Sequence, residues 1–178
     1  MWRFFRVVFS LIIVAVIIYG VLSVRPYRVT GDSMMPNLID QELVITDRIS
    51  THFVPLQRWE IIVYRDMENG WEVKIKRILG LPKEKIEIAE GKVMLIDWTK
   101  KNDIEERYLE EHVHTCLPWS CTDLSSRTFD IPVNSYFVLG DNRGSSRDSR
   151  GCSDIANCDH PPVYIPDVEI LGRVFVSF

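Results

Sequence analysis

The sequence lacks an excess of positive charge over most of its length. Its 178 residues carry 21 lysines and arginines against 25 acidic residues, a formal net charge of −4. Residues 1–28 contain four arginines and no acidic residue, so residues 29–178 carry −8. A protein that binds nucleic acid needs a concentrated basic face to neutralise phosphates. The charge distribution therefore argues against nucleic acid as a partner.

The sequence also lacks an evident internal repeat and, after residue 28, any long helical period. Short segments rich in β-branched and aromatic residues occur instead, which is typical of strands. A turn or two of helix is expected at Ile104–Glu111. The length suits one domain with a real core, and we expect that domain to be mainly β. The expected strands are Glu42–Thr46, Trp59–Tyr64, Trp71–Leu79, Lys85–Ala89, Lys92–Ile96, Asn134–Leu139 and Val168–Val176.

Charge is absent from Val7–Val24, a run of eighteen residues. As an α-helix this run would measure about 27 Å, close to the hydrocarbon thickness of a bilayer. We predict a membrane anchor at residues 1–28 and a second domain at 29–178, with 99–127 as an excursion inserted between strands. Four aromatic residues suit the membrane–water interfaces: Trp2, Phe4, Phe5 and Tyr19.

Two other interpretations of the apolar run are a cleaved signal peptide and a buried core helix. The run is too long for a signal peptide and no Ala-x-Ala cleavage site follows it. Arginines at both ends disfavour a core helix. Because two arginines lie on each side of the run, the positive-inside rule does not decide its orientation.

Cysteines are few, and the four present form two local pairs. An even number at close spacing favours disulfides in an oxidising compartment. A zinc site with nearby histidines (His112, His114, His160) and free thiols are the alternatives, although the spacings are looser than in usual zinc knuckles. Disulfides would place the body outside the cytoplasm and the N-terminus inside. The candidates are Cys116, Cys121, Cys152 and Cys158.

The chemistry-bearing residues lie in three stretches, beginning with Ser33 in GDSMMPNL and Lys76 in KIKRILGLP. On a strand, Lys74 and Lys76 share one face. An ordinary lysine, with a pKa of about 10.4, is neutral in only about 0.04% of molecules at pH 7. Lys76 could deprotonate a serine only if desolvation or a nearby cation lowers its pKa. Lys74 is interpreted as a solvated or edge-protecting charge.

The third stretch is the polar loop Gly140–Arg150, after an apolar strand. Ion pairs are possible between either of two acids and either of two arginines, so a purely structural turn is one interpretation. On the functional interpretation, the Ser146 hydroxyl would hold a buried lysine amine in place. The ion-pairing candidates are Asp141, Asp148, Arg143 and Arg150.

The ordered trio SMMPNL, KRILGLP and YFVLGDNRGSSRDSRG, behind an N-terminal anchor, resembles type I signal peptidases. These are membrane-bound serine/lysine proteases that remove signal peptides. Weaker likeness runs through KIEIAEGKVMLI, ERYLEEH and VEILGRVFV, so the resemblance covers nearly all of the chain. The ordered trio is far more specific than any of its parts.

The resemblance implies a role for each of these residues. Ser33 would be the nucleophile, Lys76 the base, and Ser146 the residue that orients the lysine. The oxyanion would be held by backbone N–H groups, including that of Ser33, because Gly31 stands where some members have a serine. Two residues would support the loop and two would do structural work nearby: Asp148 and Arg150, then Asp141 and Arg143.

The resemblance also implies the fold, partners and location. The fold would be a coiled, mainly antiparallel β-sheet body whose apolar surface rests on membrane lipid. The substrate would be an extended preprotein segment with small residues at the first and third positions before the cut, bound by addition to a strand edge. No metal or cofactor is implied. The protein would cross the cell membrane once, with its N-terminus cytoplasmic and its peptidase domain extracytoplasmic.

Three turns depart from the family pattern, which often has Gly-Asp where this chain has Asp40-Gln41, Trp59-Glu60 and Lys83-Glu84. Glycine permits φ > 0, so we expect local differences in these turns. The segment from Cys152 to Cys158 is also unlike the common pattern and would alter the rim of the cleft.

Three other functions are compatible with parts of the pattern. Conjugation-system peptidases, which mature a pilin or transfer protein, share the same motifs but act on one dedicated substrate. A membrane-tethered binding module that has lost catalysis is disfavoured by the intact Ser33, Lys76 and Ser146. A self-cleaving repressor is disfavoured because no DNA-binding segment precedes Ser33.

Overall fold

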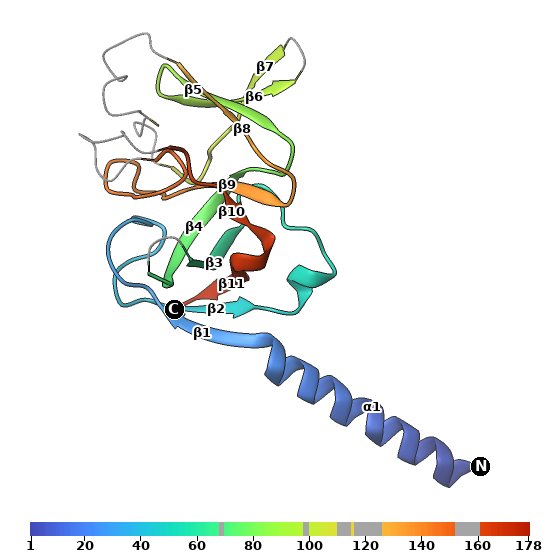
Figure 1. The fold of residues 1–178 in the computed structure, drawn as a ribbon. Coiled ribbons are helices and arrows are strands. Elements are labelled where there is room, and N and C mark those ends of the chain that lie inside the picture. The colour runs from blue at the N-terminus through green and yellow to red at the C-terminus, as the bar shows by residue number, and fades with distance from the viewer. Residues whose placement is uncertain (68–69, 98–99, 110–114, 116–125, 152–160) are drawn as a thin grey trace.

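A single long helix projects from a body of two antiparallel β-sheets (Figure 1). The computed structural model describes residues 1–67, 70–97, 100–109, 115, 126–151 and 161–178. Mainly β structure with one N-terminal apolar helix is the predicted fold class, and it is confirmed. The four cysteines and the segment between Cys152 and Cys158 lie outside the described residues.

Helix α1 (Trp2–Ser23) is long and apolar enough to cross a membrane. Among its 22 residues only Ser23 is buried against the body. The helix passes directly into strand β1 (Val24–Arg28), which pairs with β2 (Leu43–Asp47). Residues 24–28, part of the predicted anchor, therefore belong to the sheet. Pro26 is tolerated there because β1 is an edge strand.

The larger sheet has seven strands in the order β1-β2-β11-β3-β4-β9-β10, and the smaller has four in the order β7-β6-β5-β8. Two short 3₁₀ turns, η1 (Ser50–His52) and η2 (Asp167–Glu169), join strands of the larger sheet. The remaining strands of the larger sheet are β3 (Ile61–Asp66), β4 (Glu72–Gly80), β9 (Ser135–Leu139), β10 (Ile165–Pro166) and β11 (Ile170–Ser177). The smaller sheet contains β5 (Lys85–Ala89), β6 (Lys92–Asp97), β7 (Lys100–Asp103) and β8 (Arg127–Asp130).

All seven predicted strands occur, with ends within two residues of the expected ones. The predicted helix at Ile104–Glu111 is wrong over its described part, since 104–109 contains only a turn. The Ile104 N–H donates instead to the Val93 carbonyl of β6 at 2.8 Å. This segment and β7 show that the predicted excursion at 99–127 is partly built into the smaller sheet.

Three apolar clusters hold the body together. One contains Leu79, Ile86, Phe129 and Phe137 and joins the two sheets. The second lies on the larger sheet around β3, β4 and β9. The third lies beneath residues 29–38, here called the serine loop, and is built on Val29, Met34, Leu38 and Val44. Burial of one such large side chain stabilises the fold by about 1.5–3 kcal/mol. Met34, the residue after Ser33, is 1% exposed, so its buried side chain anchors the serine loop to the body at this point.

Three turns share one geometry, at Ile39–Glu42, Gln57–Glu60 and Leu81–Glu84. In each, the glutamate N–H donates to the carbonyl of the first residue, at 3.2, 3.3 and 3.1 Å. Each glutamate carboxylate also accepts the first residue's N–H, at 2.8, 2.9 and 2.7 Å. The third residue has the positive φ of a type II turn, although none is glycine. These residues are Gln41 (68°), Trp59 (71°) and Lys83 (69°).

Candidate active site

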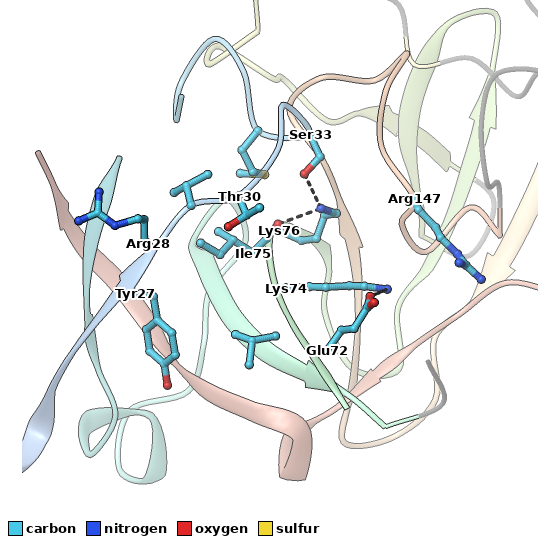
Figure 2. A pocket seen from close by; sticks show the side chains of 12 residues that line it. Tyr27, Arg28, Thr30, Ser33, Glu72, Lys74, Ile75, Lys76 and Arg147 are labelled. Atoms are coloured by element: carbon cyan, nitrogen blue, oxygen red, sulfur yellow. Dashed lines mark hydrogen bonds and ion pairs between the residues drawn. The ribbon is translucent and has the colours of Figure 1, made fainter. Parts of the chain in front are cut away.

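Ser33 and Lys76 meet at the junction of the serine loop and β4. The Lys76 Nζ lies 2.8 Å from the Ser33 Oγ (Figure 2). The amine also donates to the Ile75 carbonyl at 3.0 Å, which fixes the end of the side chain. Lys76 is opposite Ile62 in the central strand β3, so its backbone is held by the sheet. The pair has the spacing required for direct proton transfer between a nucleophile and its base.

Lys76 is only 4% exposed, and this burial changes its proton affinity. Burial lowers the pKa of Lys76 to about 8. The nearby Asp148 carboxylate raises that pKa and the Lys74 ammonium lowers it, while Asp141 and Arg150 have smaller opposing effects. At a pKa of about 8, roughly a tenth of the molecules carry a neutral amine at pH 7. The desolvation that the sequence requires of a lysine base is present.

The loop 140–150 closes over the serine loop. The Asn142 N–H donates to the Ser33 carbonyl at 3.0 Å, and the Ser145 hydroxyl lies 3.1 Å from the Asp32 carboxylate. Gly140 passes so close that a Cβ there would lie 2.5 Å from the Ser33 carbonyl oxygen. The same Cβ would lie 2.1 Å from the Ser146 Oγ. Only glycine allows these three groups to pack together.

Ser146 lies beside the dyad but does not bind the lysine in this structure. Its side chain is 5% exposed, and its Oγ has no hydrogen-bond partner among the described residues. An unpaired buried hydroxyl costs about 1–3 kcal/mol, so this group is available to a partner that enters the site. Its orienting role stays a prediction.

Buried ion pairs support the 140–150 loop. Asp148 binds Arg150 through two bonds, of 2.8 and 2.9 Å, and accepts the Gly140 N–H at 3.1 Å. Burial acts to raise the pKa of Asp148, but the Arg150 guanidinium outweighs it and holds the pKa below its ordinary value. Asp141 binds Arg77 through bonds of 2.8 and 2.6 Å. Removing one partner of such a pair costs about 3–5 kcal/mol.

Candidate oxyanion donors lie in the serine loop. The Ser33 N–H makes no hydrogen bond to the described residues, so it can donate to a developing oxyanion. The Gly31 N–H is already used, because it donates to the Asp40 carboxylate at 2.8 Å. The Ser33 N–H is therefore the better candidate of the two.

A family model described as "Signal peptidase, peptidase S26" matches residues 1–178. The chain belongs to this signal peptidase family. It is thus a serine endopeptidase that removes signal peptides from preproteins, as the sequence predicts.

Two bacterial relatives agree with this assignment in sequence. Signal peptidase I U of Bacillus subtilis is 34% identical over 146 residues, which cover 81% of this chain and 75% of that protein. A probable signal peptidase I-1 of Synechocystis is 27% identical over 187 residues, covering 99% and 84%. The crystal structure of a signal peptidase I from Enterococcus faecalis is 22% identical, with a TM-score of 0.47 over 69% of this chain and 98% of that one.

A groove of about 630 Å³ leads away from Ser33 and Lys76 of this signal peptidase. One wall is formed by apolar side chains of the β1 end and of β4, among them Tyr27 and Ile75. Lys74, Glu72 and Arg147 line the other side (Figure 2). Lys74 was predicted to be a solvated or edge-protecting charge, but its amine lies 2.5 Å from the buried Asp66 carboxylate.

The groove follows an unpaired strand edge. Residues 72–76 of β4 pair with β3 on one side, whereas β9 pairs only with 77–80. Among the described residues, no strand covers the other edge of 72–76. An extended peptide can add there as a further strand, with alternate side chains directed to the apolar and the charged wall.

Sequence reasoning missed four residues that complete the site. Arg77, rather than Arg143, binds Asp141, while Arg143 forms its ion pair with Glu106. The sequence offered only indirect signals for them. Arg77 stands beside Lys76 in KRILGLP and Asn37 lies in SMMPNL. Glu106 and Tyr108 lie in ERYLEEH, which has only a weaker likeness to the family. The four are Asn37, Arg77, Glu106 and Tyr108.

Proposed function

We propose that this signal peptidase cleaves with Ser33 as nucleophile and Lys76 as general base. The 2.8 Å contact between the Ser33 hydroxyl and a buried lysine amine carries the proposal. The lowered pKa supports it, because only a neutral amine can accept the serine proton. The supporting roles of Ser146, Asp148 and Arg150 belong to the same proposal.

The reaction follows from the positions of these groups. The neutral Lys76 amine takes the Ser33 proton as the Oγ bonds to the scissile carbonyl carbon. The Ser33 N–H donates to the resulting oxyanion. The lysine then gives its proton to the leaving amine as the C–N bond breaks, which leaves an acyl-enzyme ester. A water molecule, deprotonated by the same lysine, hydrolyses that ester and restores the serine.

The substrate would lie in the groove as an added strand. Its peptide groups would hydrogen-bond to the free edge of β4 at 72–76, and alternate side chains would face the apolar wall around Ile75. Small residues at the first and third positions before the cut lie on one face of such a strand, because side chains alternate. The family resemblance implies that preference.

Membrane lipid would be the second partner. Helix α1 would cross the membrane once, with the N-terminus cytoplasmic and the catalytic body on the outer face. Next to the helix end, the Arg48 N–H donates to the Ser23 carbonyl at 2.8 Å. The exposed Phe53 and Val54 follow soon after in the chain, as expected of a segment that contacts the membrane surface. Disulfides remain a prediction that would agree with this orientation.

The dyad is tested with Ser33→Ala and Lys76→Met in a membrane-reconstituted protein. Each variant should lose cleavage of a tagged preprotein by at least about 10³-fold while keeping the wild-type thermal unfolding curve. Ser10→Ala, in the exposed anchor, is the matched serine control. Cleavage by a folded Ser33→Ala protein would overturn the assignment. A panel of preproteins separates general processing from a single dedicated substrate and from loss of catalysis.

A further inference from the structure

Tyr108 lies outside the three motifs, yet it contacts all of them. It belongs to the segment 104–109, which leaves the smaller sheet after β7. Its neighbours are Asn37 in the serine loop, Arg77 on β4 and Arg143 in the 140–150 loop. These contacts involve three different parts of the residue: its carbonyl, its ring and its hydroxyl.

The Tyr108 ring lies against the lysine-bearing strand. The Arg77 guanidinium carbon is 4.0 Å from the ring centroid, which is the geometry of a cation–π contact. Arg77 is the residue after Lys76, and its side chain is also bound to Asp141. The ring therefore covers the ion pair that joins β4 to the 140–150 loop.

The Tyr108 carbonyl holds the serine loop. The Asn37 side-chain amide donates to this carbonyl at 2.9 Å and to the Asp141 carboxylate at 3.1 Å. Asn37 lies four residues after Ser33, beyond the buried Met34. One amide group thus ties the serine loop both to Tyr108 and to the Arg77–Asp141 pair.

The Tyr108 hydroxyl holds the 140–150 loop. It donates to Glu106 and accepts from the Arg143 guanidinium at 2.9 Å. Arg143 in turn donates from its Nε to the Gly140 carbonyl at 3.0 Å, and Gly140 is the residue that packs against the Ser33 carbonyl. Burial raises the pKa of the Tyr108 hydroxyl, so it stays protonated at neutral pH.

We infer that Tyr108 is a positioning residue, which holds the serine loop, β4 and the 140–150 loop together so that Ser33 and Lys76 stay within proton-transfer distance. It touches neither reacting atom, and the inference rests on the proposed dyad. It gives part of the predicted excursion a role in the reaction.

The test compares Tyr108→Leu with Tyr108→Phe. Leucine removes the ring contact and the hydroxyl, so kcat should fall about tenfold or more with little change in KM. Looser packing admits water to Lys76, so the acid limb of the pH profile should move to higher pH. Phenylalanine keeps the ring over Arg77 and should recover most of the activity.

Tyr164→Leu is the matched control, because Tyr164 is a partly buried ring that packs on the core cluster between the sheets and does not line the groove at Ser33 and Lys76. It should lower thermal stability without moving kcat or the pH profile below the unfolding temperature. A Tyr108→Leu enzyme with wild-type kcat and pH profile, or a Tyr164→Leu enzyme with the same defects, would overturn the inference.

Hydrogen exchange separates this inference from the dyad itself. In Tyr108→Leu, and not in Tyr164→Leu, amides of residues 31–38 and 140–150 should exchange faster, including the Asn142 N–H that binds the Ser33 carbonyl. This readout does not depend on cleavage. Unchanged exchange in both segments contradicts the positioning role, whereas an active Ser33→Ala protein contradicts only the dyad.

Discussion

In the proposed mechanism, the balance of charges around the Lys76 amine determines the activity of the site. Burial makes the Lys76 ammonium costly, and the Lys74 ammonium on the same face of β4 adds to that cost. The Asp148 carboxylate raises the pKa of Lys76, although the positive charge of its partner Arg150 offsets part of this effect. The proposed base therefore depends on charged neighbours as well as on its own burial.

This balance predicts the pH dependence of cleavage. A lysine acts as a base only when neutral, so kcat/KM should rise with pH and level off above an apparent pKa near 8. Lys74→Met removes a neighbouring positive charge and should move this limb to higher pH, while cleavage persists on the alkaline plateau. Rates measured across the pH range with one peptide substrate check both expectations.

The control replaces a lysine of the smaller sheet, away from the Lys76 amine. Lys100→Met, on the exposed strand β7, should leave the profile unchanged. If Lys74→Met moves the limb to lower pH, the proposed electrostatic effect of Lys74 has the wrong sign. Loss of cleavage at every pH would instead indicate that Lys74 contributes directly to the reaction or to substrate binding.

At the scale of single elements, the three glutamate turns determine where strands begin. Each turn leads into a strand: β2, β3 and β5. In each, the N–H of the left-handed residue donates to another segment, for example Trp59 to the Ile78 carbonyl at 2.8 Å. The turns therefore fix the strand register as well as the chain reversal. A left-handed conformation costs a residue with a Cβ about 1–2 kcal/mol.

Lys83→Gly should therefore stabilise the protein. Relief of the left-handed strain exceeds the added chain entropy of glycine, which costs about 0.5–1 kcal/mol, so the expected gain is up to about 1 kcal/mol. Lys83 is exposed, so few contacts are lost. Thermal unfolding in detergent measures the change. Lys85→Gly, two residues later within β5, should destabilise instead, and a fall in stability for both variants would contradict the argument.

The sequence predicted the elements that are marked by their own residues. It did not predict those that depend on pairing with another segment. β-branched and aromatic residues marked the longer strands, such as β4. The strand β7 has the sequence KKND, which contains no β-branched or aromatic residue. It forms a strand because it pairs with β6. The expected helix after it failed because Tyr108 and Ile104 are bound to partners distant in the sequence.

The candidate site likewise contains residues that local motifs predict and contacts that only the fold determines. The motifs gave Ser33, Lys76 and the loop 140–150, each from a short local pattern. The partner of Asp141 depended on the fold, because Arg77 lies 64 residues away and three arginines in the same loop were nearer in sequence. Choices among several possible ion pairs are made by register and burial, which a single sequence does not display.

At the scale of the whole molecule, α1 and β1 are continuous. The helix ends at Ser23 and the strand begins at Val24, without a linker between them. Five residues of β1 rise about 17 Å in total at about 3.3 Å each. Because β1 is paired with β2 and the Ser23 carbonyl accepts the Arg48 N–H, this spacing is stiff.

With α1 across the membrane as proposed, this stiff spacing would act as a ruler between the bilayer and Ser33. Ser33 would then lie at a set height above the bilayer, and a preprotein whose own apolar helix occupies that bilayer would be cut at a fixed distance beyond it. A flexible Gly-Ser-Gly insertion between Ser23 and Val24 should blur the cut position in membrane-inserted preproteins and slow their cleavage about tenfold, while a soluble peptide is cleaved at the wild-type rate. Mass spectrometry of the new N-termini measures this, with the same insertion between Glu90 and Gly91 as control. Equal slowing for both substrates would mean that the insertion harms the site, and that height plays no part in choosing the bond.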